Sequence, residues 1–283
     1  MNFDMNRTWS DAVELVQSNF QLLAVIAGVF ILIPTLIFYM AVPDFMMAAT
    51  SMEPDSGAME ALLADNAGIL VVTGLLVILA QFIAYAAMVA LVGGDRPTVG
   101  EALAMAGKAI PTLIGVTLLM MVIYVLFGLV LALAIGLIVA AISSVAGTLG
   151  IVLGTLIASV CLFGAIIYAV ARFLMVYPAI MLEGEKNPVA ALKRSLSLTK
   201  PHAKRIFWFL ALIFVAYLVI SMVVSGIFTL LASTLGSGTG AALMSGLLNG
   251  VMGALVAMIY AGLMVAMYTQ LTGGNASIGE TFD

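Results

Sequence analysis

The residues of this chain that could bind a charged group are concentrated between two apolar segments. Arg172 lies near the end of a long apolar segment, and further basic side chains follow it closely: Lys193, Arg194, Lys200, Lys204 and Arg205. Guanidinium and ammonium groups bind anionic oxygen atoms such as those of phosphates. An apolar stripe of Val189, Leu192 and Leu196 accompanies the basic residues. We therefore expect contact with anionic lipid headgroups, worth ~1 kcal/mol per basic residue near the membrane surface.

Arg172 has two interpretations. If its helix continues to Glu183, eleven residues at ~1.5 Å each would place the two charges about 16 Å apart, too far to pair. Arg172 would then need another partner inside the apolar zone, which by default indicates a functional residue. If Tyr177-Pro178 ends the helix early, the guanidinium instead reaches the lipid phosphates at the surface. The basic run as a whole also has a simpler explanation, because it could serve only to orient the chain in the membrane.

The elements that position these residues are apolar helices. The chain has 283 residues, of which 64% are hydrophobic and only 8% are charged, whereas soluble domains carry about 25% charged residues. A helix of about 20 apolar residues crosses a hydrocarbon core of ~30 Å. We predict an all-α polytopic membrane protein with six such spans: Phe20–Ala41, Ala67–Val92, Ile110–Ile142, Val145–Tyr177, Ile206–Leu231 and Ala241–Met267.

The basic residues also predict the orientation of the chain. All of them fall on one side of the six-span topology, while the loops 42–66, 143–150 and 232–240 on the other side contain no Lys or Arg. Because loops rich in Lys and Arg stay in the cytoplasm, we expect both termini there.

A repeat of 90 residues predicts three tandem units, each an interfacial amphipathic helix followed by a transmembrane hairpin. The units cover residues 8–97, 98–187 and 188–276 of a single membrane domain, and a truncated fourth start covers 277–283. Each start carries an N-terminal helix signature: capping boxes at Thr98–Glu101 and Ser277–Glu280, a looser acidic version at Thr8–Asp11, and an N-cap with proline at Asn187-Pro188.

One segment of about 45 residues resembles a known family. It contains Arg172, Pro178 six residues on, the turn Glu183-Gly184-Glu185, the run ALKRSLSLTK and the aromatic start Arg205-Ile206-Phe207-Trp208. It resembles the membrane domain found with glycerophosphodiester phosphodiesterases and the related YciC-like inner-membrane proteins. This resemblance implies a multi-pass protein of the bacterial inner membrane. The soluble loops are too short for a phosphodiesterase domain, so that activity is not expected.

The remaining reactive side chains give no sign of an enzyme. His202 is the only histidine and Cys161 the only cysteine, and no metal, phosphate-loop or dinucleotide motif is present. We expect no catalytic residue, cofactor or bound metal, and no soluble fold that could present a nucleic-acid site.

Three classes of function stay open at this point. The preferred hypothesis is a non-enzymatic membrane protein that interacts with lipids or envelope partners. A transporter or channel for a small solute or a lipid would instead place Gln81, Tyr85, Asn249 or Arg172 against a cavity. The third is a scaffold, whose partner would be a second copy of the chain or another membrane protein.

Overall fold

The computed structural model describes residues 3–43, 45–46, 56–94, 97–233 and 239–273. Every regular element in these ranges is helical. In chain order they are α1 (Met5–Ser18), α2 (Phe20–Ala27), the π-helix η1 (Gly28–Leu32), α3 (Ile33–Ala41), α5 (Ser56–Gly93), α6 (Val99–Phe173), α7 (Val176–Met181), α8 (Pro188–Thr199), the 3-10 helix η2 (Lys200–His202), α9 (Ala203–Ser233) and α10 (Thr239–Leu271).

Six helical segments are long and apolar enough to cross a membrane, which agrees with the number and approximate positions of the predicted spans. They run over Phe20–Ala41, Met59–Gly93, Val99–Ser144, Gly147–Met181, Pro188–Phe228 and Ala242–Leu271. The first of these segments comprises α2, η1 and α3, so a π-helical turn beginning at Gly28 interrupts a span that the sequence predicts as uniform.

Side-chain caps fix where several helices begin. The capping box of Thr98 and Glu101 is confirmed at the start of α6, and the Asn187 side chain caps α8 by accepting from the backbone N–H of Val189 at 2.9 Å. The expected start of the first helix at Thr8 is wrong. Asp4 caps α1 instead, because its carboxylate accepts from two backbone N–H groups of the first turn. The Ser277–Glu280 box lies outside the described residues.

The three predicted surface helices differ in the structure. The first is α1, which ends at Ser18 before a new helix begins at Phe20, and the third is α8, which η2 joins to α9. The second does not form a separate element, because α6 continues from Val99 directly into its span. The organisation into three tandem units therefore stays a prediction.

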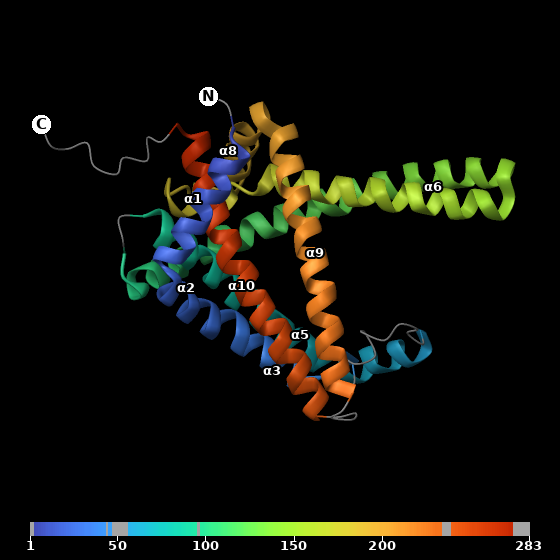
Figure 1. Ribbon diagram of the computed structural model, residues 1–283, viewed down its shortest axis with the longest axis horizontal. Coiled ribbons are helices and arrows are strands. Elements are labelled where there is room, and N and C mark those ends of the chain that lie inside the picture. The colour runs from blue at the N-terminus through green and yellow to red at the C-terminus, as the bar shows by residue number, and fades with distance from the viewer. Residues whose placement is uncertain (1–2, 44, 47–55, 95–96, 234–238, 274–283) are drawn as a thin grey trace, which may run out of the picture.

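Helix α10 lies at the centre of the bundle (Figure 1). It contacts α1, α2, α3, α5, α7 and α9. Within its most apolar stretch of 18 residues, 61% of the residues are buried in the protein. Two of its glycines allow the first span to approach closely: a Cβ on Gly246 would lie 2.9 Å from Cβ of Tyr39, and one on Gly250 would lie 3.3 Å from Cα of Leu32. Small residues four positions apart thus give α10 a face on which another helix can pack closely.

Helix α6 folds into a long hairpin that projects away from the bundle (Figure 1). The chain reverses at Gly147, whose φ of 55° and ψ of −134° fall in a region open mainly to glycine. The two arms pack closely where Gly154 faces Val139. In the most apolar stretch of 18 residues of the first arm, no residue is buried by the protein, so the leucines and valines of this stretch face outward.

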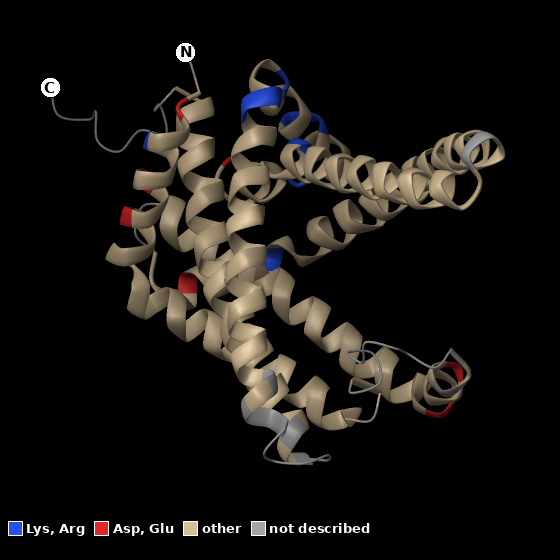
Figure 2. Cartoon of the chain, turned by 45° about the vertical axis from the view of Figure 1, so that its right-hand side comes forward, with Lys and Arg blue, Asp and Glu red and all other residues tan. Residues whose placement is uncertain are grey.

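The two ends of the described chain meet at one end of the bundle. The Asp4 N–H donates to the side-chain carbonyl of Gln270 at 3.0 Å, and Arg205 Nη1 donates to the Phe3 carbonyl at 3.4 Å. The start of α9 therefore lies at this same end. Figure 2 shows Lys and Arg gathered around α8, η2 and the start of α9, with the acidic residues of the first turns of α5 at the far end.

Candidate functional site

The site begins where α6 ends. Leu174 and Met175 form a turn between α6 and α7, so the helix stops immediately after Arg172 and Phe173. The sequence places this break at Tyr177-Pro178, which is wrong by a few residues. Pro178 instead lies in the first turn of α7, where a missing N–H costs no helical hydrogen bond.

Ser195 of α8 bridges this break. Its hydroxyl accepts from the Met175 N–H at 3.2 Å and donates to the Arg172 carbonyl at 2.8 Å. The break leaves two backbone groups without helical partners, and Ser195, which is fully buried, satisfies both. Helix α8 is therefore attached to the end of α6 by hydrogen bonds as well as by apolar packing.

The Arg172 guanidinium turns toward the end of α8. Its Nη1 donates to the Thr199 hydroxyl at 2.8 Å, and that hydroxyl donates to the Ser195 carbonyl at 2.8 Å. Within the described part of the chain Arg172 forms no ion pair. The break shows that the helix does not continue from Arg172 to Glu183, so that premise of the first interpretation is wrong. Its partner is a buried hydroxyl one helix away.

Glu183 joins three elements of the same end of the bundle. Arg194 of α8 donates hydrogen bonds to its carboxylate from both Nε and Nη2, at 2.9 and 2.7 Å. The Tyr268 hydroxyl of α10 also donates to it, at 2.8 Å. Burial would raise the pKa of Glu183, but the hydrogen bonds from Arg194 and Tyr268 and the charge of Arg194 outweigh burial and lower it. Glu183 is therefore an ionised anchor, and Arg194 is engaged within the protein.

The remaining predicted residues form an exposed group, which we call the basic corner: Lys193, Lys200, Lys204 and Arg205. All four are exposed. Lys193 and Lys200 lie seven residues apart, or about two helical turns, and so share a face of the helix. The three lysines have no hydrogen bond or ion pair with any residue that the structure describes. Their ammonium groups are available to an external anion.

The buried face of α8 differs from the predicted stripe. Val189 is 46% exposed, and the face that packs inward consists of Ala191, Leu192, Ser195 and Thr199. Sequence reasoning missed Ser195 and Thr199 as well as Tyr268. A signal for the first two exists in the sequence, because they lie four residues apart and therefore on one helical face.

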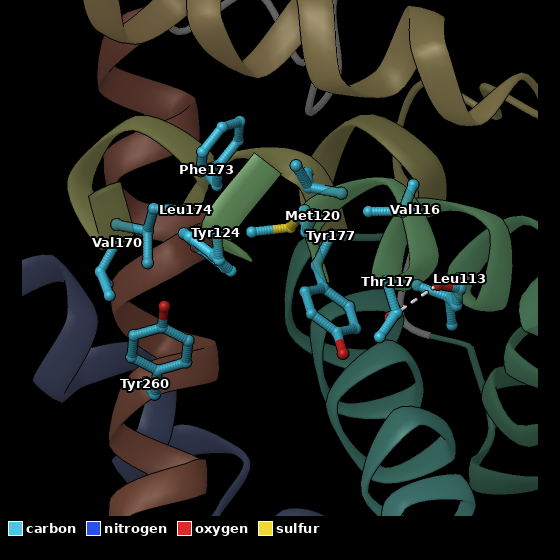
Figure 3. Close-up of a pocket in the computed structure, with 11 residues that line it drawn as sticks. Leu113, Val116, Thr117, Met120, Tyr124, Val170, Phe173, Leu174, Tyr177 and Tyr260 are labelled. Carbon is cyan, nitrogen blue, oxygen red and sulfur yellow. Dashed lines mark hydrogen bonds between the residues drawn. The ribbon is translucent and has the colours of Figure 1, made fainter. Parts of the chain in front are cut away.

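A pocket of about 200 Å³ lies between the two arms of α6, α7 and α10 (Figure 3). Its walls are apolar apart from one threonine and three tyrosines: Leu113, Val116, Thr117, Met120, Tyr124, Val170, Phe173, Leu174, Val176, Tyr177 and Tyr260 line it. None of the polar residues that the transporter hypothesis places against a cavity is among them. The pocket is also smaller than the ~300 Å³ at which small-molecule sites begin.

Comparisons with known proteins add no relative to this picture. No family model, no curated protein and no solved structure matches the chain.

Proposed function

We propose that this chain is a non-enzymatic integral membrane protein that binds anionic phospholipid headgroups at its basic corner. The observation that carries the proposal is the state of Lys193, Lys200 and Lys204. All three are exposed, the elements that carry them lie at one end of the bundle (Figure 2), and none has an anionic partner among the described residues. Unpaired ammonium groups beside a membrane attract anionic lipids at ~1 kcal/mol each.

The surroundings of the basic corner favour a lipid over a soluble anion. Trp208, one turn after Lys204 on α9, is 67% exposed, and an exposed tryptophan next to basic residues is typical of the membrane interface. Further along α9 the exposed side chains are large and apolar, including Leu212, Val215 and Val219. A ligand at the corner would therefore meet charge and hydrocarbon surface together, as a phospholipid does.

Arg172 and Arg194 play a supporting part in this proposal. Arg194 is held by Glu183 and Arg172 by Thr199, so both arginines fix α8 against the bundle. The corner's own four residues supply the charge that faces outward.

The proposal also includes the setting of the protein. The basic end would face the cytoplasm of a bacterial inner membrane, with both termini on that side and three tandem units forming the body. The positive-inside bias supports the orientation, and the resemblance to the phosphodiesterase-associated membrane domain supports the compartment. We include as partner a second copy or another membrane protein, packed against the outward-facing arms of α6.

Lipid titration of the purified full chain tests the proposal. The protein in mild detergent is titrated with phosphatidylglycerol or phosphatidylcholine, and bound lipids are counted by native mass spectrometry. The pair Lys200→Gln with Lys204→Gln should weaken phosphatidylglycerol binding by about five-fold per charge and leave phosphatidylcholine binding unchanged. The matched control, Arg7→Gln with Lys108→Gln, removes the same charge from exposed positions elsewhere.

Two results would contradict the proposal. One is equal affinity of the unmodified protein for the two lipids. The other is an equal loss of phosphatidylglycerol binding in the corner variant and in its control, which would mean that net charge alone governs the affinity.

A further inference from the structure

The pocket at the foot of the α6 hairpin contains hydroxyl groups that the protein does not satisfy. Thr117 donates to the Leu113 carbonyl at 2.9 Å, but the side-chain hydroxyls of Tyr177 and Tyr260 form no hydrogen bond with any described residue. Among the residues that the structure describes, every buried side-chain nitrogen or oxygen atom has a hydrogen-bond partner. The hydroxyls of Tyr177 and Tyr260 must therefore open onto accessible space, and both side chains line the pocket.

The aromatic packing holds these tyrosines in place. Tyr85 of α5 packs against both, with ring centroids 5.9 Å from Tyr177 and 6.0 Å from Tyr260. On the opposite wall Tyr124 packs edge-on against Phe173 at 6.0 Å. Figure 3 shows the Tyr260 hydroxyl pointing toward the space beside Val170, Leu174 and Tyr124. Tyr260 is thus directed into the pocket from α10, and its ring is fixed from behind.

The contacts around the pocket show that it lies close to the start of α8. Thr112, next to the pocket residue Leu113, donates to the Lys186 carbonyl in the basic linker at 3.0 Å. Gly115 lies against the Pro188 ring at the start of α8, where a Cβ would come within 2.7 Å. On the other arm, Phe173 and Leu174 directly follow Arg172. The pocket therefore lies next to the start of α8. In the proposed setting, with α8 at the membrane surface, this is where the headgroup region of a bilayer gives way to its hydrocarbon.

Size and chemistry limit the occupant. A volume of about 200 Å³ is below the range of drug-sized ligand sites, so the pocket has room for one end of an acyl chain and not for a whole phospholipid. The apolar walls exclude an ionic group, because an unpaired charge there would lose its hydration. A free hydroxyl in such surroundings needs an acceptor. An ester carbonyl at the head of an acyl chain provides one at this depth.

We infer that the pocket holds the ester-linked beginning of one acyl chain of a glycerophospholipid, with the Tyr260 hydroxyl donating to the ester carbonyl. The inference rests on the proposed function, since it assigns the chain of the lipid whose phosphate binds at the basic corner. The base of the α6 hairpin would then distinguish ester-linked from ether-linked lipid chains, whereas the basic corner distinguishes headgroups by their charge.

Photolabelling of the full chain tests the inference. Phosphatidylglycerol with a diazirine near the head of one acyl chain is prepared in ester-linked and ether-linked forms, and the labelled peptides are mapped by mass spectrometry. The ester lipid should label the peptides that carry the pocket residues. Tyr260→Phe should lower this labelling by about five-fold, the effect of one neutral hydrogen bond, while the ether lipid should be unaffected.

Matched variants separate the pocket from the rest of the apolar surface. Val170→Phe narrows the pocket at a position that is already 36% exposed, so the fold should tolerate it, and it should reduce the labelling by both lipids. Val152 and Tyr168 lie on the same arm outside the pocket. The control variants Val152→Phe and Tyr168→Phe should therefore leave the labelling of the pocket peptides unchanged. Label spread evenly over the arms of α6, or ester labelling that ignores Tyr260→Phe, would overturn the inference.

The design also separates this inference from the proposed function. If only the headgroup proposal fails, phosphatidylcholine will label the pocket as strongly as phosphatidylglycerol, and the Tyr260→Phe effect will persist. If only the pocket assignment fails, the preference for phosphatidylglycerol will persist with its label outside the pocket.

Discussion

The Ser195 hydroxyl of α8 lies 2.8 Å from the Arg172 carbonyl, at the point where α6 ends. The same oxygen accepts from the Met175 N–H beyond the break. One buried side chain thus supplies both hydrogen bonds that a continuous helix would have made internally. Because the basic corner continues directly from α8, its position depends on this attachment.

Ser195→Ala should destabilise the protein by about 1–3 kcal/mol, the cost of leaving buried polar groups without partners. The measurement is the free energy of unfolding of the purified chain in detergent. Ser197→Ala is the matched control on the same helix, because Ser197 is exposed and its hydroxyl bonds only to the Arg194 carbonyl one turn back. Equal stabilities of the two variants would argue against a bridging role for Ser195.

The carboxylate of Glu183 should make stability depend on pH in the acid range. Its pKa is lowered in the folded protein, so its stabilising effect is complete above the unfolded value of about 4.3 and is lost as the pH falls through the folded value. Glu183→Gln should therefore lower the midpoint temperature of unfolding at neutral pH. The difference in midpoint temperature between this variant and the unmodified protein should shrink below about pH 4.3. Glu14→Gln, at an exposed position, should show neither effect; a gap that stayed constant down to acid pH would be inconsistent with this role.

Gly262 should be required for the docking of α1 on α10. A Cβ there would lie 2.9 Å from the backbone oxygen of Ala12 and 2.7 Å from Val16 Cγ2. Gly262→Ala should cost about 1–3 kcal/mol by overpacking. Gly253→Ala on the same helix meets only an ordinary contact of 3.5 Å and should be tolerated, so unfolding of the two variants at the same midpoint would contradict this packing.

The proposed orientation can be tested with single cysteines. Cys161 is the only cysteine and is replaced by Ala to give a blank background. A membrane-impermeant maleimide should then label Lys200→Cys only from the cytoplasmic side, in inverted vesicles, and Glu60→Cys only from the outside, in spheroplasts. Labelling of both positions from one side would refute the topology.

The positions of the spans could be predicted from the sequence because they depend on the length and polarity of continuous segments. Hydrocarbon-length runs such as Phe20–Ala41 recur in the structure with the same bounds. The caps at Thr98 and Asn187 were likewise predictable, since a cap depends on residues within one helical turn.

The contacts of the site could not be predicted in this way, because they join residues far apart in the chain. Tyr268 reaches Glu183 across 85 positions, and no local pattern encodes that approach. The break after Phe173 was misplaced for a related reason. Pro178 is the residue that local rules associate with a helix end, whereas the actual break is stabilised by Ser195 of another helix.

Trp208 lies beside the basic corner and provides a direct reporter of the anionic lipid that we expect to gather there. The chain has two tryptophans, so in a Trp9→Phe background fluorescence comes from Trp208 alone. In mixed bilayers, brominated phosphatidylglycerol should quench Trp208 at lower mole fractions than brominated phosphatidylcholine, and Lys200→Gln with Lys204→Gln should remove the difference. Equal quenching by the two lipids in the protein with an intact corner would mean that the basic corner does not select anionic lipid.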